Sequence, residues 1–212
     1  MNAHVPLAEI RREQTIRLRE TYCDFVYNPD YAKVTEFFFS KIYDTSYKDK
    51  RDEAFNRLYE KLLAAVGEER ITRVTMLKEL NELTDELDLA VAQKHQELFG
   101  AAKVNRRSYE EAFARTDREE DRERQVFLLI ETTRFFHKLA HLPFLGFVIT
   151  PTKIAARVMK MEHLMDFFME GYHAFKSVKN ADPFFEAVER REREYRHKLY
   201  ERYGVKHIKR SK

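Results

Sequence analysis

Apolar residues recur every three or four positions along most of this chain of 212 residues, which is the spacing of one face of an α-helix. The longest such run lies between Glu68 and Phe99 and has no internal glycine or proline. We predict one long helix there, closed by Gly100. Shorter runs predict helices over residues 6–28, 30–43, 48–66, 151–178 and 182–203, and two more that begin at Ser108 and Thr116.

Polar residues at the starts of several runs are suited to cap helices. The Asp30 side chain can accept a hydrogen bond from the free N–H groups of the second helix. Ser108 with Glu111, and Thr116 with Glu119, match the capping-box pattern, in which a hydroxyl and a carboxylate each satisfy a backbone donor. We expect these residues to mark the starts of three helices.

The composition agrees with this helical pattern. The chain has only 5 glycines and 5 prolines, while 43% of its residues are hydrophobic and 35% are charged, which favours long helices over a turn-rich β architecture. Asp182-Pro183 is typical of the start of a helix, and Gly204 is suited to end it. We predict a single all-α domain, a bundle of seven to nine helices over residues 1–204, followed by a basic tail at 205–212.

Cysteine content and hydrophobic run lengths indicate the compartment. Cys23 is the only cysteine, which excludes an intrachain disulfide and fits a reducing environment. Its neighbours Tyr22 and Phe25 lead us to expect a buried, inert side chain. The longest uncharged apolar run, residues 142–150, is far shorter than the roughly 20 residues of a spanning helix, and no secretory signal pattern opens the chain. We expect a cytoplasmic protein without a membrane span.

The stretch from Tyr31 to Asp52 is the most distinctive part of the sequence. Three consecutive phenylalanines open the segment Phe37–Tyr43, and an Arg-Asp pair follows. Further matches to one family pattern are dispersed along the chain: Gln14, Arg17, Leu18, Thr21, Tyr22, Leu83, Leu87, Asp88, Tyr109, Ala112, Phe113, Arg122, Glu123, Gln125, Pro151, Phe168, Glu170, Gly171, Ala174, Phe175, Arg191 and Glu192. The sequence resembles the FFLEELY-motif proteins, an uncharacterised bacterial helical family. The resemblance implies a helical protein and names no activity.

This sequence departs from the family's motif at two positions. The two glutamates of the consensus are replaced by Ser40 and Lys41, so any carboxylate site there would be missing from this chain. The aromatic positions and the closing Tyr43 are retained. Because aromatic rows at helical spacing are usually part of a core, we predict that the segment packs and does not contact a ligand.

Several polar residues are difficult to explain as plain surface. Gln14, Arg17 and Thr21 lie three and four residues apart, beside the apolar stripe of the first helix. If they converge with similar groups elsewhere, they form a buried ion-pair network or the polar wall of a ligand pocket, and we favour the network. The candidates are Gln14, Arg17, Thr21, Tyr43, Arg51, Asp52, Arg122, Glu123, Glu170, Arg191 and Glu192.

Two Glu-x-x-His pairs raise the alternative of a metal site. Glu170 with His173, and Glu194 with His197, have the spacing that ferritin-like di-iron proteins use to direct both side chains at one metal pair. Two chance matches are expected in a chain with 36 acidic residues and 8 histidines. The second pair is flanked by Arg193, Arg196 and Lys198, which favours a solvated face. We therefore expect no metal or other cofactor.

The basic residues of the last helix raise a third alternative, nucleic-acid binding. Arginines and tyrosines alternate there, and together they can serve phosphates and stacked bases. Acidic residues at positions 189, 192, 194 and 201 alternate with them, so much of the field should cancel in a salt-bridged, solvated helix.

The sequence favours a non-catalytic, soluble helical binding or interaction protein, with a small apolar ligand between the helices as one form of it. A ferritin-like metal-dependent oxidoreductase is the alternative, and a nucleic-acid-binding protein comes third. We expect no membrane span. The partner is left open between another protein and a second copy of this chain.

Overall fold

The computed structural model describes residues 6–39, 68–142 and 162–205, and these residues form helices and no strand. The predicted all-α class is therefore confirmed for this part of the chain. None of its helices is long and apolar enough to cross a membrane. The helices are α1 (Leu7–Thr21), α2 (Cys23–Val26), α3 (Ala32–Phe37), α5 (Glu68–Phe99), α6 (Arg106–Ala114), α7 (Glu119–Ala140), α9 (Glu162–Lys176) and α10 (Asp182–Tyr203).

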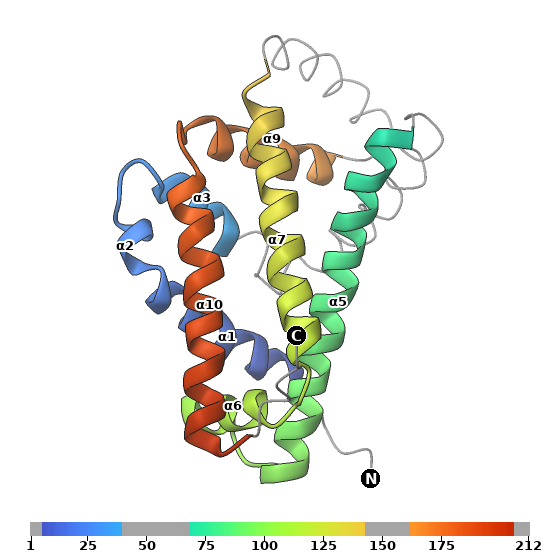
Figure 1. Ribbon diagram of the computed structural model, residues 1–212, viewed down its shortest axis with the longest axis vertical. Helices are drawn as coiled ribbons and strands as arrows, with labels where there is room; N and C mark the ends of the chain where they lie inside the picture. Colours follow the sequence, from blue (N-terminus) through green and yellow to red (C-terminus); the bar gives the residue numbers. More distant parts are fainter. Residues whose placement is uncertain (1–5, 40–67, 143–161, 206–212) are drawn as a thin grey trace, which may run out of the picture.

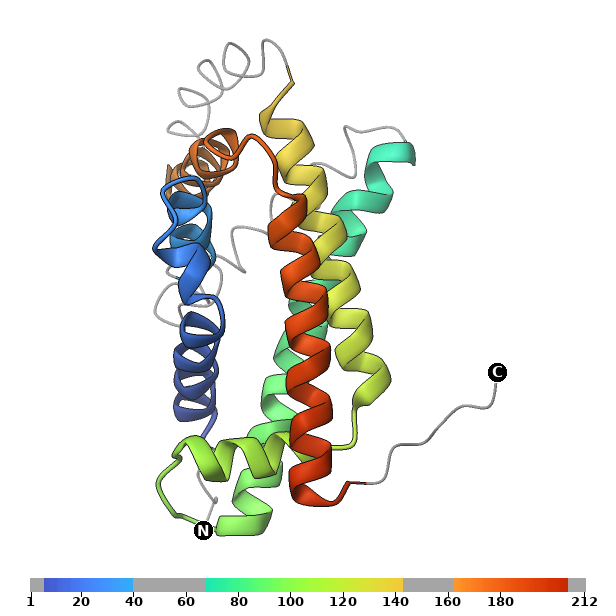
Figure 2. The same cartoon turned by 60° about the vertical axis from the view of Figure 1, so that its left-hand side comes forward.

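Three long helices, α5, α7 and α10, run along the length of the molecule (Figure 1). α7 packs against both α5 and α10, while α1 lies across α5. Figure 2 shows the short α6 crossing the lower end, where it contacts α5 and α10. At the upper end α3 packs against α9, and α9 against α7. The bundle therefore has an upper and a lower end with different covers.

The core consists of two apolar clusters, one towards each end. The upper one is rich in phenylalanine and joins α1, α2, α3, α7, α9 and α10. Its rings meet mostly edge to face, as in the pair Phe25–Phe184 with centroids 5.2 Å apart. We call Phe25, Phe37, Phe38, Phe175, Phe184 and Phe185 the aromatic cluster. The lower one is smaller and gathers around Ile10, Val91, Tyr109, Phe113 and Leu199.

Two glycines end long helices as predicted. Gly100 follows α5 with φ at 60°, and Gly204 caps α10 with φ at 63°. Both values lie in the left-handed region, where a residue without Cβ is favoured. The bounds of α5 and of the start of α10 also agree with the predicted segments 68–99 and 182–203.

The first predicted helix is broken in the structure, so the continuous segment 6–28 was wrong. Tyr22 leaves the helical conformation, with φ −113° and ψ 22°, and a separate α2 begins at Cys23. The Tyr22 hydroxyl donates to Glu192 of α10 at 2.9 Å, a tertiary contact that helical spacing does not reveal. The expectation of a buried Cys23 was also wrong, because its side chain is exposed.

The second helix is shorter than predicted where the structure describes it. Asp30 does not cap it; the Asp30 N–H instead donates to the Asn28 side chain at 2.9 Å, in a turn that precedes α3. Helix α3 ends at Phe37, and the next two residues continue in a wider, π-type turn. Residues 40–43 and the predicted helix 48–66 lie outside the described residues.

The described part of the aromatic motif is packed inside the molecule. Phe37, Phe38 and Phe39 are each more than nine tenths buried, which agrees with the predicted packing role. Phe37 lies against Gly171 of α9 so closely that a Cβ at position 171 would be 2.9 Å from its Cζ atom. Phe37 and Phe38 also contact Phe175. The motif therefore fixes α3 onto α9.

Both predicted capping boxes were wrong in detail. Asn105 caps α6, and Ser108 is the third helical residue, whose hydroxyl accepts from the Asn105 N–H while its own N–H donates to Asn105 Oδ1. The Thr116 hydroxyl donates to the Ala112 carbonyl instead of capping α7. α7 begins at Glu119 without a side-chain cap. Several side chains in such a loop can accept from a first-turn N–H, so the sequence alone does not show which one caps the helix.

Candidate functional site

A layer of polar side chains separates the two apolar clusters. On α1, Ile10 belongs to the lower cluster and Leu18 to the upper one, while Gln14 and Arg17 between them are 6% and 4% exposed. These four residues lie on one face of the helix because Gln14, Arg17 and Leu18 follow Ile10 by four, seven and eight positions. The face that enters the core is therefore interrupted by an amide and a guanidinium.

The same interruption occurs on α10. On α10, Glu192 and Arg196 stand between Val188 of the upper cluster and Leu199 of the lower one. Arg196 is 4% exposed. Arg122, near the start of α7, is 5% exposed and lies in the same layer. We call Gln14, Arg17, Arg122, Glu192 and Arg196 the arginine layer.

Arg17 and Glu192 form the ion pair of this layer. Arg17 Nη1 lies 2.5 Å from Glu192 Oε1, and the same oxygen accepts from the Tyr22 hydroxyl. The guanidinium also lies 4.5 Å from the centre of the Tyr195 ring. Burial alone lowers the pKa of Arg17, but the Glu192 carboxylate, with the hydroxyls of Tyr109 and Tyr195, holds it well above its ordinary value. Arg17 is therefore a fully charged, buried cation with a carboxylate partner.

Arg122 lacks such a partner. Its Nη1 donates to Gln125 Oε1 and its Nη2 to the Leu87 carbonyl, both at 3.4 Å, and the guanidinium stacks 4.4 Å above the Phe113 ring. No carboxylate oxygen of the described residues lies within 4.0 Å of it. Burial lowers the pKa of Arg122, although an arginine side chain stays protonated in proteins.

Arg196 is the least satisfied member of the layer. Among the described residues its one ion pair is with Glu123 at 3.7 Å, and that carboxylate is 62% exposed. Within the described part of the chain its guanidinium makes no hydrogen bond, and its Nε atom is fully buried. The Nε of Arg17 is also buried without a partner. The layer therefore holds two buried N–H donors that have no acceptor among the described residues.

Two further buried groups support the layer from behind. The Tyr109 hydroxyl donates to Gln14 Oε1 at 3.0 Å and is fully buried, which raises its pKa. Asp88 of α5 accepts from Arg11 Nε at 3.1 Å through one oxygen, while its other oxygen has no partner among the described residues. Burial raises the pKa of Asp88. These contacts fix α1 against α5 and α6.

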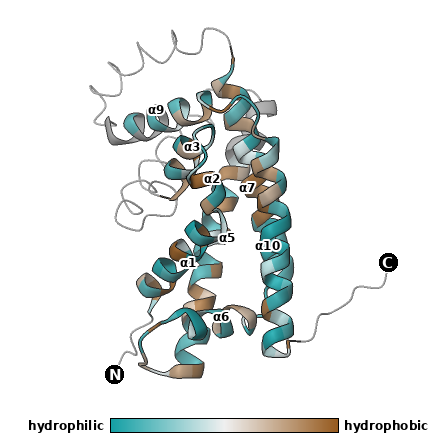
Figure 3. Cartoon of the chain, turned by 90° about the vertical axis from the view of Figure 1, so that its left-hand side faces the viewer, coloured by the Kyte–Doolittle hydropathy of each residue, from teal (hydrophilic) through white to brown (hydrophobic). Residues whose placement is uncertain are grey.

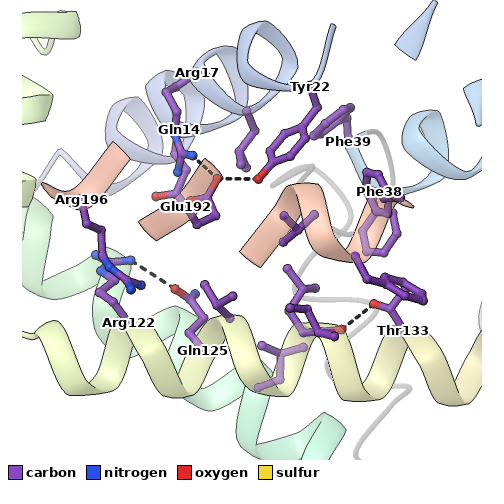
Figure 4. A pocket seen from close by; sticks show the side chains of 18 of the residues that line it. Gln14, Arg17, Tyr22, Phe38, Phe39, Arg122, Gln125, Thr133, Glu192 and Arg196 are labelled. Carbon is purple, nitrogen blue, oxygen red and sulfur yellow. Dashed lines mark hydrogen bonds and ion pairs between the residues drawn. The ribbon is translucent and has the colours of Figure 1, made fainter. Parts of the chain in front are cut away.

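A pocket opens beside the arginine layer, with a cavity volume of about 60 Å³. Figure 4 shows its polar end, where Gln14, Arg17, Arg122, Glu192 and Arg196 approach from three helices. Its remaining lining is mostly apolar and comes from α1, the residues after α3, α5, α6, α7 and α10: Leu18, Phe38, Phe39, Leu80, Phe113, Val126, Leu129, Ile130, Phe184, Phe185 and Val188. Tyr22, Gln125 and Thr133 add polar atoms to it that are already hydrogen-bonded, to Glu192, Arg122 and the Leu129 carbonyl. The pocket thus has a cationic end and an apolar body.

Comparison with known proteins gives one match. Residues 2–204 match a family described as a domain of unknown function, DUF8198. The chain belongs to the DUF8198 family. No curated protein and no solved structure matches it. The match spans nearly the whole chain and brings no activity with it.

The structure of this DUF8198 chain brings together some of the residues singled out in the sequence. Gln14, Arg17, Arg122 and Glu192 meet at the pocket, and Phe38 and Phe39 of the aromatic motif line its wall. Arg196, expected on a solvated face, is buried at the same pocket, so that expectation was wrong. The alternation of arginine with glutamate around it concealed its position.

Other candidates lie elsewhere in the DUF8198 chain. The Thr21 carbonyl accepts from Arg191, which also forms two hydrogen bonds to Asp24 at the surface. Glu123 is exposed near Arg196, and Glu170 is exposed on α9. Tyr43, Arg51 and Asp52 lie outside the described residues.

Sequence reasoning also missed two members of this region, Asp88 and Tyr109. Both were noted as family matches, but neither was singled out for the site. Helical spacing gives a signal for Asp88, which precedes Val91 by three residues and so lies on the buried face of α5. Tyr109 has a weaker signal, because a tyrosine in an apolar stripe is usually plain core.

The pairs predicted for the alternatives are on the surface. Glu170, His173, Glu194 and His197 are exposed, and the described residues contain no group of three metal-ligating side chains. On α10, whose visible surface is largely hydrophilic in Figure 3, Arg190 pairs with Glu194, and Arg193 with Glu189. The expected salt bridging of this helix is thus present at these pairs.

Proposed function

We propose that this DUF8198 protein is a non-catalytic helical binding protein that holds a small ligand in the pocket beside the arginine layer. The observation that carries the proposal is the cavity itself, which lies where α1, α7 and α10 present apolar walls. There Arg17 and Arg196 also keep buried N–H donors without a partner among the described residues. Pockets that bind small molecules combine largely apolar walls with a few polar groups that fix orientation. This combination fits ligand binding better than a core closed by ion pairs alone.

The size of the cavity limits the ligand. A volume of about 60 Å³ has room for about four to six water-sized groups, since one buried water takes about 10–15 Å³ on this measure. A drug-sized molecule needs a larger pocket. The expected ligand is therefore a compact molecule of a few non-hydrogen atoms.

Binding is favoured over catalysis by the chemistry of the polar end. Three of its five side chains are guanidiniums, which donate hydrogen bonds and do not exchange protons near neutral pH. General acid–base catalysis needs a group that titrates near the working pH. Neither the ferritin-like alternative nor nucleic-acid binding gains an observation from the described residues.

The proposal extends to the relatives of the protein and to its location in the cell. The resemblance in Phe37–Phe39 supports counting the chain among the FFLEELY-motif proteins of bacteria, and an alignment of DUF8198 sequences across this segment tests it. A cytoplasmic location is supported by Cys23, the only cysteine of the chain, which is an exposed free thiol. Cell fractionation tests the location.

Thermal unfolding with small probes tests the binding function. n-Butanol, butanamide, butylammonium and butanoate are titrated separately against the wild type. At least one should raise the unfolding temperature, because a ligand that binds only the folded state stabilises it. The effect should disappear in Val126→Phe, which fills the pocket from α7, and persist in Ile16→Phe, a matched increase at an exposed position of α1.

The outcomes separate cleanly. If Val126→Phe does not fold, Val126→Leu offers a smaller filling of the same wall. If none of the four probes stabilises the wild type, or if stabilisation persists in the filled variant, the pocket is not the binding site and the proposed function is wrong.

A further inference from the structure

The charges of the arginine layer narrow the ligand to one chemical class, an inference that rests on the proposed binding function. We propose that the pocket binds a short-chain aliphatic monocarboxylate. Its carboxylate lies against Arg122 and Arg196, and its chain lies along the apolar wall.

The pocket is short of buried negative charge. Three guanidiniums line the pocket, each about nineteen twentieths buried, and Glu192 is the only carboxylate among the described lining residues. Glu192 is already bonded to Arg17 and to the Tyr22 hydroxyl. A buried cation without a counter-charge is strongly disfavoured, so Arg122 and Arg196 call for an anion.

The N–H groups of Arg122 and Arg196 are also short of hydrogen-bond acceptors. Arg122 makes two hydrogen bonds, both 3.4 Å long and both to neutral oxygens. Arg196 makes none within the described residues, and its Nε is fully buried. A guanidinium presents its N–H groups as a planar fork that matches a carboxylate, so these donors suit the two oxygens of such a group.

The net charge of the arginine layer and its neighbouring carboxylates sets the charge of the ligand. The carboxylate of Asp88 attracts the Arg122 guanidinium electrostatically, but Asp88 does not line the pocket. One of its oxygens accepts a hydrogen bond from Arg11. Counting the interior carboxylates, Asp88 and Glu192, against the three buried guanidiniums leaves one positive charge in excess. Glu123 lies 3.7 Å from Arg196 but is 62% exposed, so water screens most of its charge. Arg11 does not add to it, because Asp85 is its second partner, at 2.7 Å. A single negative charge neutralises the layer.

The apolar body of the pocket favours a ligand with a hydrocarbon chain. Phe38, Val126, Ile130 and Phe184 are among its walls and offer contact to hydrocarbon, while the Thr133 hydroxyl of the same lining already donates to the Leu129 carbonyl. An inorganic anion would leave these walls uncovered. A carboxylate with a short alkyl chain fills both ends, and butanoate has about as many non-hydrogen atoms as the cavity has water-sized places.

Calorimetric titration of butanoate and of its neutral isostere butanamide tests the inference. We expect the wild type to bind butanoate at least about tenfold more tightly than butanamide, because a charge-assisted hydrogen bond is worth about ten- to hundredfold in affinity. Arg196→Met should lose about that factor for butanoate and little for butanamide. Arg193→Met, three residues away and exposed, should bind both probes as the wild type does.

Each other outcome overturns the inference in a recognisable way. If butanamide or n-butanol binds as well as butanoate, the pocket is a binding site but not for a carboxylate. Tighter binding of inorganic phosphate than of butanoate also contradicts it. If no probe binds, the proposed function fails with it. Should Arg196→Met not fold, Arg196→Lys keeps the charge without the fork, and unchanged butanoate affinity in that variant contradicts the assignment.

Discussion

The aromatic cluster and the arginine layer are equally buried but differ in what surrounds them. Phe38 and Phe184 are 5% and 7% exposed, and Arg17, Arg122 and Arg196 are 4–5% exposed. Each ring of the cluster meets other rings, whereas two of the three guanidiniums have weak partners or none. Burial alone therefore does not show that a side chain stabilises the fold. We expect the cluster to stabilise the bundle, and the layer to hold charge in the core at a cost in stability.

The largest expected effect is in the aromatic cluster. Phe184 contacts Tyr22, Phe25 and Phe38, so Phe184→Ala removes a shared neighbour and leaves a cavity. We expect the free energy of unfolding to fall by about 3–5 kcal/mol in urea denaturation. The control Phe127→Ala, at a half-exposed position, should lose about 1 kcal/mol or less. Equal losses would mean that the cluster is not the stabilising region.

The next effect concerns the ion pair of the arginine layer. Glu192→Gln leaves the buried Arg17 without its counter-charge and should lower the free energy of unfolding by about 2–4 kcal/mol. Glu189→Gln removes an exposed partner of Arg193 and should change it by about 1 kcal/mol or less. The double variant Arg17→Met with Glu192→Gln should recover part of the loss. If the double variant is no more stable than Glu192→Gln alone, the packing of the Arg17 side chain matters more to stability than its unpaired charge.

A smaller effect of opposite sign is expected at Arg196. Arg196→Met removes a buried charge that has only a distant, exposed partner and keeps the apolar stem. We expect the ligand-free protein to gain about 1 kcal/mol of unfolding free energy, because apolar replacement of buried charge is often stabilising. Arg193→Met should stay within about 0.5 kcal/mol of the wild type. A loss above about 1 kcal/mol in Arg196→Met would erase the contrast between the two regions.

The smallest effect is a pH dependence at the surface. Hydrogen bonds from Arg191 hold the pKa of Asp24 below its ordinary value. This stabilisation is complete above the unfolded-state pKa of about 3.9 and is lost as the pH falls through the folded-state value. Because Asp24 is 55% exposed, it should amount to only about 0.2–1 kcal/mol. Unfolding of wild type and Asp24→Asn at pH 7 and pH 3 measures it.

High salt serves as the control for Asp24, because it should weaken an exposed pair. The contribution of the interior residue Asp88 to stability changes with pH in the opposite direction. Burial raises its pKa, so its contribution is complete below the unfolded-state value and is lost as the pH rises through the folded-state value. Acid dependence that is the same in Asp24→Asn as in the wild type would contradict the surface contribution.

Features that depend on a few neighbouring residues could be predicted from the sequence. Gly100 and Gly204 end helices because a left-handed backbone at those points favours glycine whatever the rest of the fold does. The capping of α6 was predicted at Ser108 but is made by Asn105, since both can accept from a first-turn N–H and only the loop geometry selects one. Local signals located the helices more reliably than their caps.

The candidate site could be predicted only in part. Gln14 and Arg17 were found because polar residues on an apolar helical face are conspicuous in the sequence. Arg196 was missed because its charged neighbours resemble a solvated surface. Cys23 was misplaced because its burial was inferred from its neighbours Tyr22 and Phe25, which are buried while Cys23 is exposed. Each of these errors arose where a contact between distant segments determines exposure.

By itself the sequence of this DUF8198 protein determined the helical class, the long α5, the ends of two helices and the aromatic character of the core. Periodicity and glycine conformation are properties of short segments, so they need no knowledge of neighbours in space. Only the tertiary structure decided which polar residues meet. Arg17, Arg122 and Arg196 are far apart in the chain, and the crossing of α1, α7 and α10 brings their charges to one pocket.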